Sequence, residues 1–156
     1  MPSLEERVQR LEDLEAIRAL KIRYAGLCDD AYNPEGLAAL FAGDAVWDGT
    51  PHLGRFEGRA AIRAYFAGAS AEVTFALHYT LGHLIDVEVS GTRATGTWYL
   101  LMPGTVLGRR AVWVGGTYRD VYVKQDGHWL FQDVRLHLDF ITPYEKGWVT
   151  KPFAGQ

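Results

Sequence analysis

The sequence predicts an α+β fold in which three or four helices close the open side of a strongly curved, cone-shaped sheet of antiparallel or mixed strands. Apolar residues recur at helical spacing until about residue 72, and strand-like alternation with Gly and Pro punctuation begins near residue 73. The helices therefore precede the main sheet and do not alternate with its strands, which argues against a βαβ fold. No linker or internal repeat interrupts the chain, so we expect one domain over residues 1–156.

The first helix begins at a capping box formed by Ser3 and Glu6. An apolar stripe at helical spacing follows and places Tyr24 on the buried side. The acidic pair at positions 29 and 30 ends the helix. The stripe consists of Leu4, Val8, Leu11, Ile17, Leu20, Tyr24 and Leu27.

Two shorter helices should follow. Asn33 and Pro34 form a turn that supplies a proline for the first helical position, and Gly58 opens the third helix. Their apolar faces are Leu37, Leu40 and Phe41 in the second helix, and Ile62 and Phe66 in the third.

The strands are expected near residues 45–49, 74–89, 93–102, 111–124 and 128–142, and the last four should form a meander. Residues 90–91 (Ser-Gly) and 126–127 (Asp-Gly) stand where two-residue hairpin turns belong. Strands of ten residues or more in so small a protein must bend, which encloses a deep pocket. Bulges or bends are expected at Gly82, Gly96, Gly115 and Gly116.

Composition narrows the possible partners. A net charge of −3 with scattered Lys and Arg offers no basic stripe, so we expect no nucleic acid partner. The apolar runs are too short to cross a bilayer and the N-terminus does not resemble a signal peptide, so we expect a cytoplasmic protein without a membrane partner. Cys28 is alone, which excludes an internal disulfide. The high aromatic content, 13% with five Trp, predicts a lined pocket or a subunit interface.

The sequence lacks the motifs of the common cofactor and nucleophile sites. It contains no Gly-rich phosphate loop, no Gly-x-Ser-x-Gly, no HExxH and no EF-hand loop. His78 and His83 are five residues apart on an expected strand, so their side chains should point to opposite faces. We therefore expect no metal site there.

Three residues suggest proton chemistry: Tyr24 and Asp29 late in the first helix, and His78 at the start of the sheet. A carboxylate bonded to one imidazole nitrogen fixes the tautomer and makes the other nitrogen a general base. A phenol nearby can donate to a carbonyl or to a departing oxygen. The alternative is that the acid only ends a helix while the two aromatic rings are ordinary core residues.

Several segments resemble the SnoaL-like branch of the nuclear-transport-factor-two-like superfamily, and this resemblance covers nearly the whole chain. The family's dehydratases and dehydrochlorinases eliminate a small leaving group without a cofactor, using a histidine in the pocket. The resemblance implies that His78 is this histidine, that Asp29 pairs with it better than Asp30, and that Tyr24 matches the dehydratases' tyrosine. The matching segments are residues 14–20, 43–47, 56–62, 77–79, 115–120 and 125–129.

The resemblance also implies which side chains line the pocket. The sequence itself differs from the family's pattern at two positions. Met102 stands where one relative has a catalytic aspartate, and the family's arginine on the last strand has no counterpart, because alternation places Arg135 on the outer face. The side chains expected to contact the substrate are Trp47, Trp98, Met102, Tyr118, Asp120, Leu138 and Phe140.

Taken together, these expectations predict a cofactor-independent lyase that acts on a small, largely apolar aromatic or polycyclic substrate. Two alternatives remain open: an isomerase, aldol-type cyclase or retro-aldol lyase that uses the same base, and a non-catalytic binding module. The family resemblance implies a homo-oligomer, with a trimer favoured over a dimer. The tail of residues 143–156, which carries Trp148 and Phe153 in an irregular segment, is expected to pack over the pocket or on a neighbouring subunit.

Overall fold

A curled, mixed sheet of seven strands forms a half-barrel in the computed structural model, which describes residues 1–154. The strand order is β2-β1-β7-β6-β5-β3, and β4 also pairs with β5. All neighbours are antiparallel except β1 and β7, which are parallel. The strands are β1 (Phe41–Asp48), β2 (Arg55–Glu57), β3 (Val73–Ala76), β4 (Tyr79–Val87), β5 (Arg93–Val106), β6 (Arg110–Gln125) and β7 (His128–Pro143).

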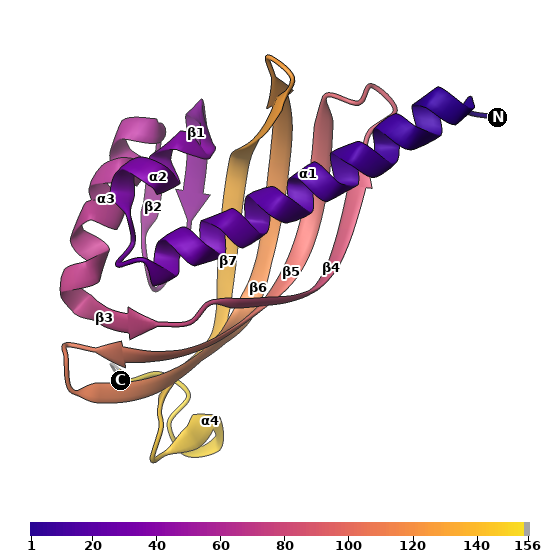
Figure 1. The fold of residues 1–156 in the computed structure, drawn as a ribbon. Coiled ribbons are helices and arrows are strands. Elements are labelled where there is room, and N and C mark those ends of the chain that lie inside the picture. Colours follow the sequence, from indigo (N-terminus) through magenta and orange to yellow (C-terminus); the bar gives the residue numbers. More distant parts are fainter. Residues whose placement is uncertain (155–156) are drawn as a thin grey trace.

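The long strands β5, β6 and β7 curl around one side of the molecule (Figure 1). Two bulges accompany the bending, at glycines that the sequence singled out. The β6–β7 register shifts between Gly115 and Gly116, and the β4–β5 register shifts between Leu81 and Leu84. Gly82 lies within the second bulge with φ +45, a conformation that a side chain would disfavour. The predicted meander is therefore present, with bulges at Gly82 and at Gly115 and Gly116, whereas Gly96 pairs in regular register with Ile85 and Asp120.

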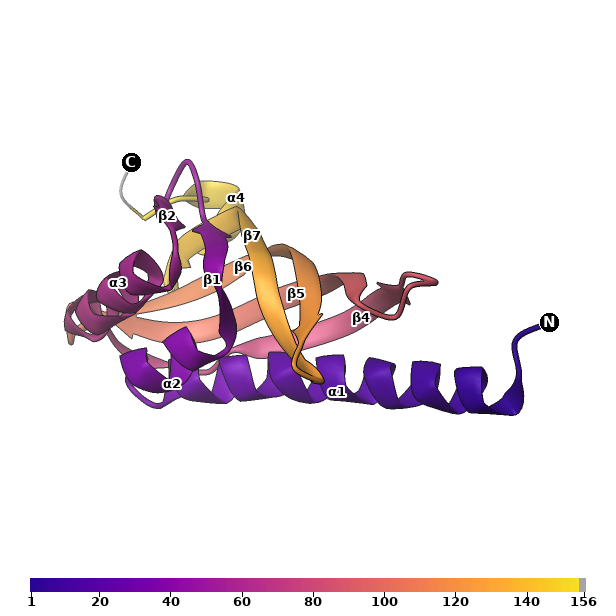
Figure 2. The same cartoon turned by 90° about the horizontal axis from the view of Figure 1, so that it is seen from above.

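Four helices accompany the sheet: α1 (Leu4–Asp29), α2 (Pro34–Ala39), α3 (Arg59–Glu72) and α4 (Gly147–Thr150). Helix α1 crosses the open side of the sheet, while α2 and α3 lie together over one end (Figures 1 and 2). The predicted capping box forms, because Ser3 Oγ accepts from the backbone N–H of Glu6 and the Glu6 carboxylate accepts from that of Ser3. None of the helices within residues 1–154 combines the length and apolarity needed to cross a membrane.

Only the second half of the apolar stripe on α1 is buried. Ile17 and Tyr24 are in the core, whereas the side chains of Leu4 and Leu11 are 72% and 65% exposed. The reason is that the N-terminal end of α1 projects beyond the sheet, which leaves these side chains exposed (Figure 2). The second half anchors the helix and fixes the position of its C-terminal end.

The structure corrects two strand boundaries and adds two short elements. The expected strand over 74–89 is two strands, because the pairing stops at residues 77–78. Strand β1 begins at Phe41, which the sequence placed in a helix; this residue is fully buried and pairs with Phe131 of β7. The short elements β2 and α4 were not predicted, since three or four residues carry no usable periodicity.

Candidate active site

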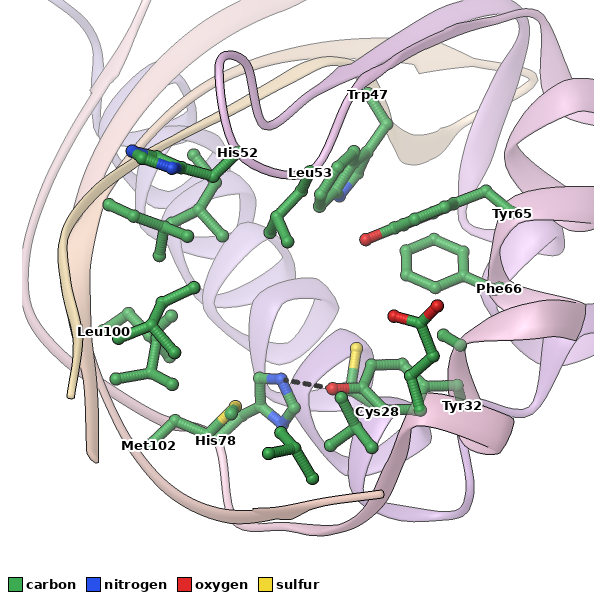
Figure 3. Close-up of a pocket in the computed structure, with 18 of the residues that line it drawn as sticks. Cys28, Tyr32, Trp47, His52, Leu53, Tyr65, Phe66, His78, Leu100 and Met102 are labelled. Carbon is green, nitrogen blue, oxygen red and sulfur yellow. Dashed lines mark hydrogen bonds between the residues drawn. The ribbon is translucent and has the colours of Figure 1, made fainter. Parts of the chain in front are cut away.

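A cavity of about 740 Å³ lies between helices α1 and α3 and the concave face of the sheet. Its walls differ in kind. Aromatic rings from α1, β1 and α3 face aliphatic side chains from β5, β6 and β7 (Figure 3). The aromatic wall contains Tyr24, Tyr32, Trp47, Tyr65 and Phe66, and the aliphatic wall contains Leu100, Met102, Val106, Val114, Leu136, Leu138 and Ile141.

Asp29 and His78 meet at the edge of this cavity. Asp29 Oδ1 lies 2.7 Å from His78 Nδ1 and also accepts the backbone N–H of His78 at 2.9 Å. The imidazole is 6% exposed and the carboxylate 28%. A carboxylate only accepts hydrogen bonds, so Nδ1 carries the proton and the lone pair of neutral His78 is on Nε2. Asp30 takes no part in this contact and accepts instead from Asn33 at 3.4 Å.

The local backbone explains why this contact forms. Asp29 is the last residue of α1, where the helix dipole disfavours a negative charge. His78 lies in the break between β3 and β4, so its backbone N–H has no neighbouring strand to pair with. The backbone N–H and the Nδ1–H of His78 therefore stabilise the Asp29 carboxylate in a position that the helix dipole disfavours. These two hydrogen bonds also connect the end of α1 to the segment between β3 and β4.

Tyr32 also reaches the histidine, which the sequence did not reveal. Its hydroxyl lies 3.5 Å from His78 Nε2, and its ring stacks on Phe66 with 6.2 Å between centroids. Burial raises the pKa of Tyr32, so the phenol stays protonated near neutral pH. The residue adopts φ +53 in the turn after α1. Such a turn has no periodicity, and the only available signal was an aromatic residue placed two positions after the acidic pair.

Tyr24 lines the cavity farther along α1. Its hydroxyl accepts a hydrogen bond from the Trp47 indole N–H at 3.0 Å. Burial raises the pKa of Tyr24 well above its ordinary value, so this phenol also keeps its proton. Because Trp47 occupies an acceptor position on the oxygen, the proton of Tyr24 remains available for donation to a ligand.

Four of the seven side chains expected to contact substrate line the cavity: Trp47, Met102, Tyr118 and Leu138. Their substrate contacts remain a prediction. Arg135 is exposed on the outer face, as the strand alternation predicted. The cavity therefore has the thioether of Met102 on β5, and β7 contributes only apolar side chains to its lining.

Trp98 and Asp120 point inward but lie behind the cavity wall. Lys21 covers Asp120, donating to its Oδ2 at 2.8 Å, and Tyr122 donates to the same oxygen at 2.9 Å. The indole of Trp98 donates to Tyr122 at 3.0 Å. Lys21 Nζ also lies 3.4 Å from the centroid of the Tyr118 ring. The alternation of side chains along β6 predicted the correct face of the sheet for Asp120. It could not predict that Lys21 of α1 packs between Asp120 and the cavity.

Phe140 lies on the opposite side of β7 from the cavity. Strand alternation alone would place it inward with Leu138, but the β6–β7 register skips Asp139, and Ile141 takes the next inward position. The Phe140 ring instead lies over Gly115 and stacks on Trp148 of the tail, with 5.1 Å between centroids. A bulge of one residue thus reverses the side on which Phe140 lies.

The structure shows no arrangement of ligands for a metal ion. Within residues 1–154, no three His, Cys, Asp or Glu side chains gather closely enough to bind one together. His83 of β4 is directed away from His78, since it accepts from Arg18 at 2.8 Å and its ring contacts that of Trp98. The polar and titratable side chains at the cavity include imidazole, carboxylate and phenol groups and the thiol of Cys28.

Comparisons with known proteins identify the family and the fold. The model of the SnoaL-like domain matches residues 9–135. The structure named "Putative Scytalone Dehydratase" from Novosphingobium aromaticivorans is 26% identical with a TM-score of 0.80, covering 96% of this chain and 98% of its own. One named "putative aromatic ring hydroxylase", from the same species, is 25% identical with a TM-score of 0.78 over 85% and 94%. A hexachlorocyclohexane dehydrochlorinase is 21% identical over 88% and 92%, with a TM-score of 0.81, and so shares the fold.

Proposed function

Because the chain belongs to the SnoaL-like domain family, we propose that it is a cofactor-independent lyase whose base is His78. The observation that carries the proposal is the 2.7 Å contact between Asp29 Oδ1 and His78 Nδ1 beside an open cavity. This contact leaves Nε2 as the proton acceptor. The dehydratase and dehydrochlorinase names among the similar structures describe elimination reactions and support the same reaction class.

The reaction begins when His78 Nε2 removes a proton from a carbon next to a carbonyl or a comparable activating group. The electron pair of the broken C–H bond forms the new double bond, and the C–O bond breaks with its electrons on the oxygen. The departing oxygen takes a proton from Tyr24, and water leaves. The His78 proton then returns to the Tyr24 phenolate, which restores the site.

Asp29 stabilises the imidazolium that forms in this step and holds the ring in the productive tautomer. A positioned general base contributes about 10²–10⁴-fold to the rate, so the cavity walls must supply the rest by orienting the substrate. The aromatic wall and the aliphatic wall favour a flat, largely apolar molecule.

The decisive experiment replaces His78 by Ala and measures turnover of hydroxylated carbonyl compounds by mass spectrometry of the products. We expect turnover to be abolished while the circular dichroism spectrum is unchanged. Retained turnover would remove the mechanism. Product mass separates the neighbouring reactions, because dehydration loses one water, retro-aldol cleavage releases a carbonyl fragment, and isomerisation leaves the mass unchanged.

A further inference from the structure

We infer that His52 binds a second oxygen-bearing group of the substrate, at the part of the cavity opposite His78. The substrate class would then be a neutral, flat, apolar molecule with an oxygen at each end. Only the assignment of the reacting end rests on the proposed function. His52 itself is placed by independent observations.

The loop between β1 and β2 carries His52 to the cavity. His52 is one of the residues that border the cavity, and it lies across the cavity from His78 (Figure 3). Its ring is stacked on Phe153 of the tail, with 4.3 Å between centroids and 16° between planes. Stacking uses the face of the imidazole and leaves both nitrogens at its edge for polar contacts.

Those nitrogens have no partner within residues 1–154, where His52 uses only its backbone N–H, which donates to the Gly49 carbonyl at 3.1 Å. The nearby cavity side chain of Leu53 is apolar. His52 is a solvent-exposed residue at the edge of this largely apolar cavity, so a ligand oxygen that reached its ring nitrogens would take the place of water there.

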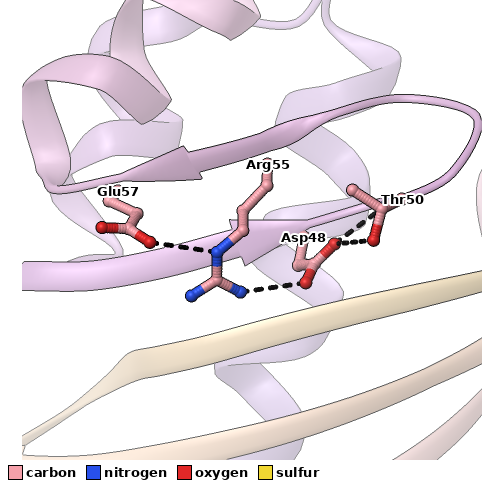
Figure 4. Close-up of polar contacts among 4 residues, drawn as sticks. All are labelled: Asp48, Thr50, Arg55 and Glu57. Atoms are coloured by element: carbon pink, nitrogen blue, oxygen red, sulfur yellow. Dashed lines mark hydrogen bonds and ion pairs between the residues drawn. The ribbon is translucent and has the colours of Figure 1, made fainter.

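A polar network of Asp48 at the end of β1, Thr50 in the loop, and Arg55 and Glu57 of β2 fixes the base of the loop that carries His52 (Figure 4). Asp48 accepts from the backbone N–H and the hydroxyl of Thr50 at 2.9 and 2.7 Å, and from Arg55 at 2.9 Å. Arg55 donates further to Glu57 at 3.0 Å. These hydrogen bonds hold the pKa of Asp48 below its ordinary value. The loop is therefore ordered before a ligand arrives, which lowers the cost of binding.

The stacking partner is fixed as well. The tail pairs with the end of β7, since Ile141 N–H donates to the Pro152 carbonyl at 2.9 Å and Ala154 N–H donates to the Ile141 carbonyl at 2.7 Å. Phe153 lies between these two bonds. Two separately fixed segments thus hold the imidazole of His52 at one orientation.

Charge at the cavity selects a neutral ligand. Glu72, the last residue of α3, borders the cavity, and Asp29 lies behind His78. A ligand carboxylate would meet both negative charges, whereas a hydroxyl or carbonyl oxygen would not. The remaining lining between His52 and His78 is mostly apolar, so an oxygen placed midway along the ligand would lose its hydration without gaining a partner.

The inference is tested by isothermal titration calorimetry with naphthalene, 2-naphthol, 2,6-dihydroxynaphthalene and 4,4′-dihydroxybiphenyl. The second hydroxyl of the better-fitting diol should improve affinity for the unaltered protein about 2- to 13-fold, the value of one net hydrogen bond. In His52→Ala this gain should disappear while the affinity for 2-naphthol is kept. A gain that persists in His52→Ala, or no gain in the unaltered protein, overturns the inference.

Two control variants separate hydrogen bonding from packing. His52→Phe preserves a ring for stacking on Phe153 and should lose the gain, whereas His52→Gln preserves a donor and an acceptor and should recover part of it. The opposite pattern would show that His52 only packs. Preference for 6-hydroxy-2-naphthoate over the diol would overturn the neutral substrate class. Binding requires no turnover, so this test can succeed or fail whatever the outcome for His78→Ala.

Discussion

The indole N–H of Trp47 in β1 donates to the hydroxyl of Tyr24 in α1 over 3.0 Å, which links the first strand to the central helix at the cavity wall. The bond sets the rotation of the Tyr24 hydroxyl, because an oxygen that accepts from one side directs its own proton elsewhere. The orientation of the Tyr24 hydroxyl, the proposed proton donor, thus depends on Trp47, which has no part in the proposed reaction itself.

Replacing Tyr24 by Phe removes this donor and should lower kcat about 10²-fold, the usual effect of one donor to a developing oxyanion. Trp47→Phe should have a smaller effect in the same direction, since the hydroxyl remains but is free to rotate. Steady-state kinetics on both variants shows whether kcat falls more in Tyr24→Phe than in Trp47→Phe. If Tyr32→Phe lowers kcat and Tyr24→Phe does not, the donor is the phenol beside His78.

Asp29→Asn should lower kcat about 10²–10⁴-fold with a lesser change in KM. The amide no longer stabilises the imidazolium and no longer imposes one tautomer. Asp30→Asn is the matched control, because its carboxylate contacts Asn33 and not His78, and its kinetics should equal those of the unaltered protein. Equal losses in the two variants would contradict the role given to Asp29.

Lys21→Met should destabilise the protein by about 3–5 kcal/mol, because it leaves the fully buried Asp120 without its cation. The pair Lys21→Met and Asp120→Leu together should recover most of that loss, since no buried charge remains. Urea unfolding measures both. Glu15→Gln, which removes an exposed pair with Arg18, should change stability by less than about 1 kcal/mol. A Lys21→Met variant as stable as this control would contradict the prediction.

The protein should lose stability steeply as the pH rises above about 9. Burial raises the pKa values of Cys28 and of five tyrosines, Tyr24, Tyr32, Tyr65, Tyr118 and Tyr122, so these groups stay protonated in the fold but ionise once unfolded. The folded state then binds more protons, and each group lowers the free energy of unfolding by up to about 1.4 kcal/mol per pH unit. The lowered pKa of buried Lys21 acts in the opposite sense, but it is one group against six.

Urea unfolding at several pH values between 8 and 11 measures this slope. Tyr24→Phe removes one ionising group and should make the slope shallower by one proton. Stability that is constant through this range would contradict the prediction.

Much of the fold was predictable because its signals are local. Ser3 and Glu6 mark the start of α1, and the glycines at 115 and 116 mark a bulge, since each depends on neighbours in sequence or on backbone freedom. The position of Asp29 at the end of α1 and of His78 at the edge of the sheet followed from the same boundaries and from family resemblance.

The errors arose where tertiary packing decided the outcome. Periodicity gave Asp120 the correct face, but only the packing of α1 shows that Lys21 separates it from the cavity. One skipped residue in β7 reversed Phe140, because the two glycines mark a bulge in β6 but the sequence does not show which residue of β7 the register skips. Tyr32 and His52 lie in turns, where no repeat predicts the direction of a side chain.

The loop that carries His52 is braced by Thr50 and by the strand residues that flank it, Asp48 of β1 and Arg55 and Glu57 of β2, while Asp29 and His78 are held by α1 and the break between β3 and β4. The two parts of the cavity are therefore structurally separable. Grafting a loop of different composition between β1 and β2 should retune ligand preference without disturbing the acid and imidazole, which makes this segment the natural place to begin redesign or to look for divergence among relatives.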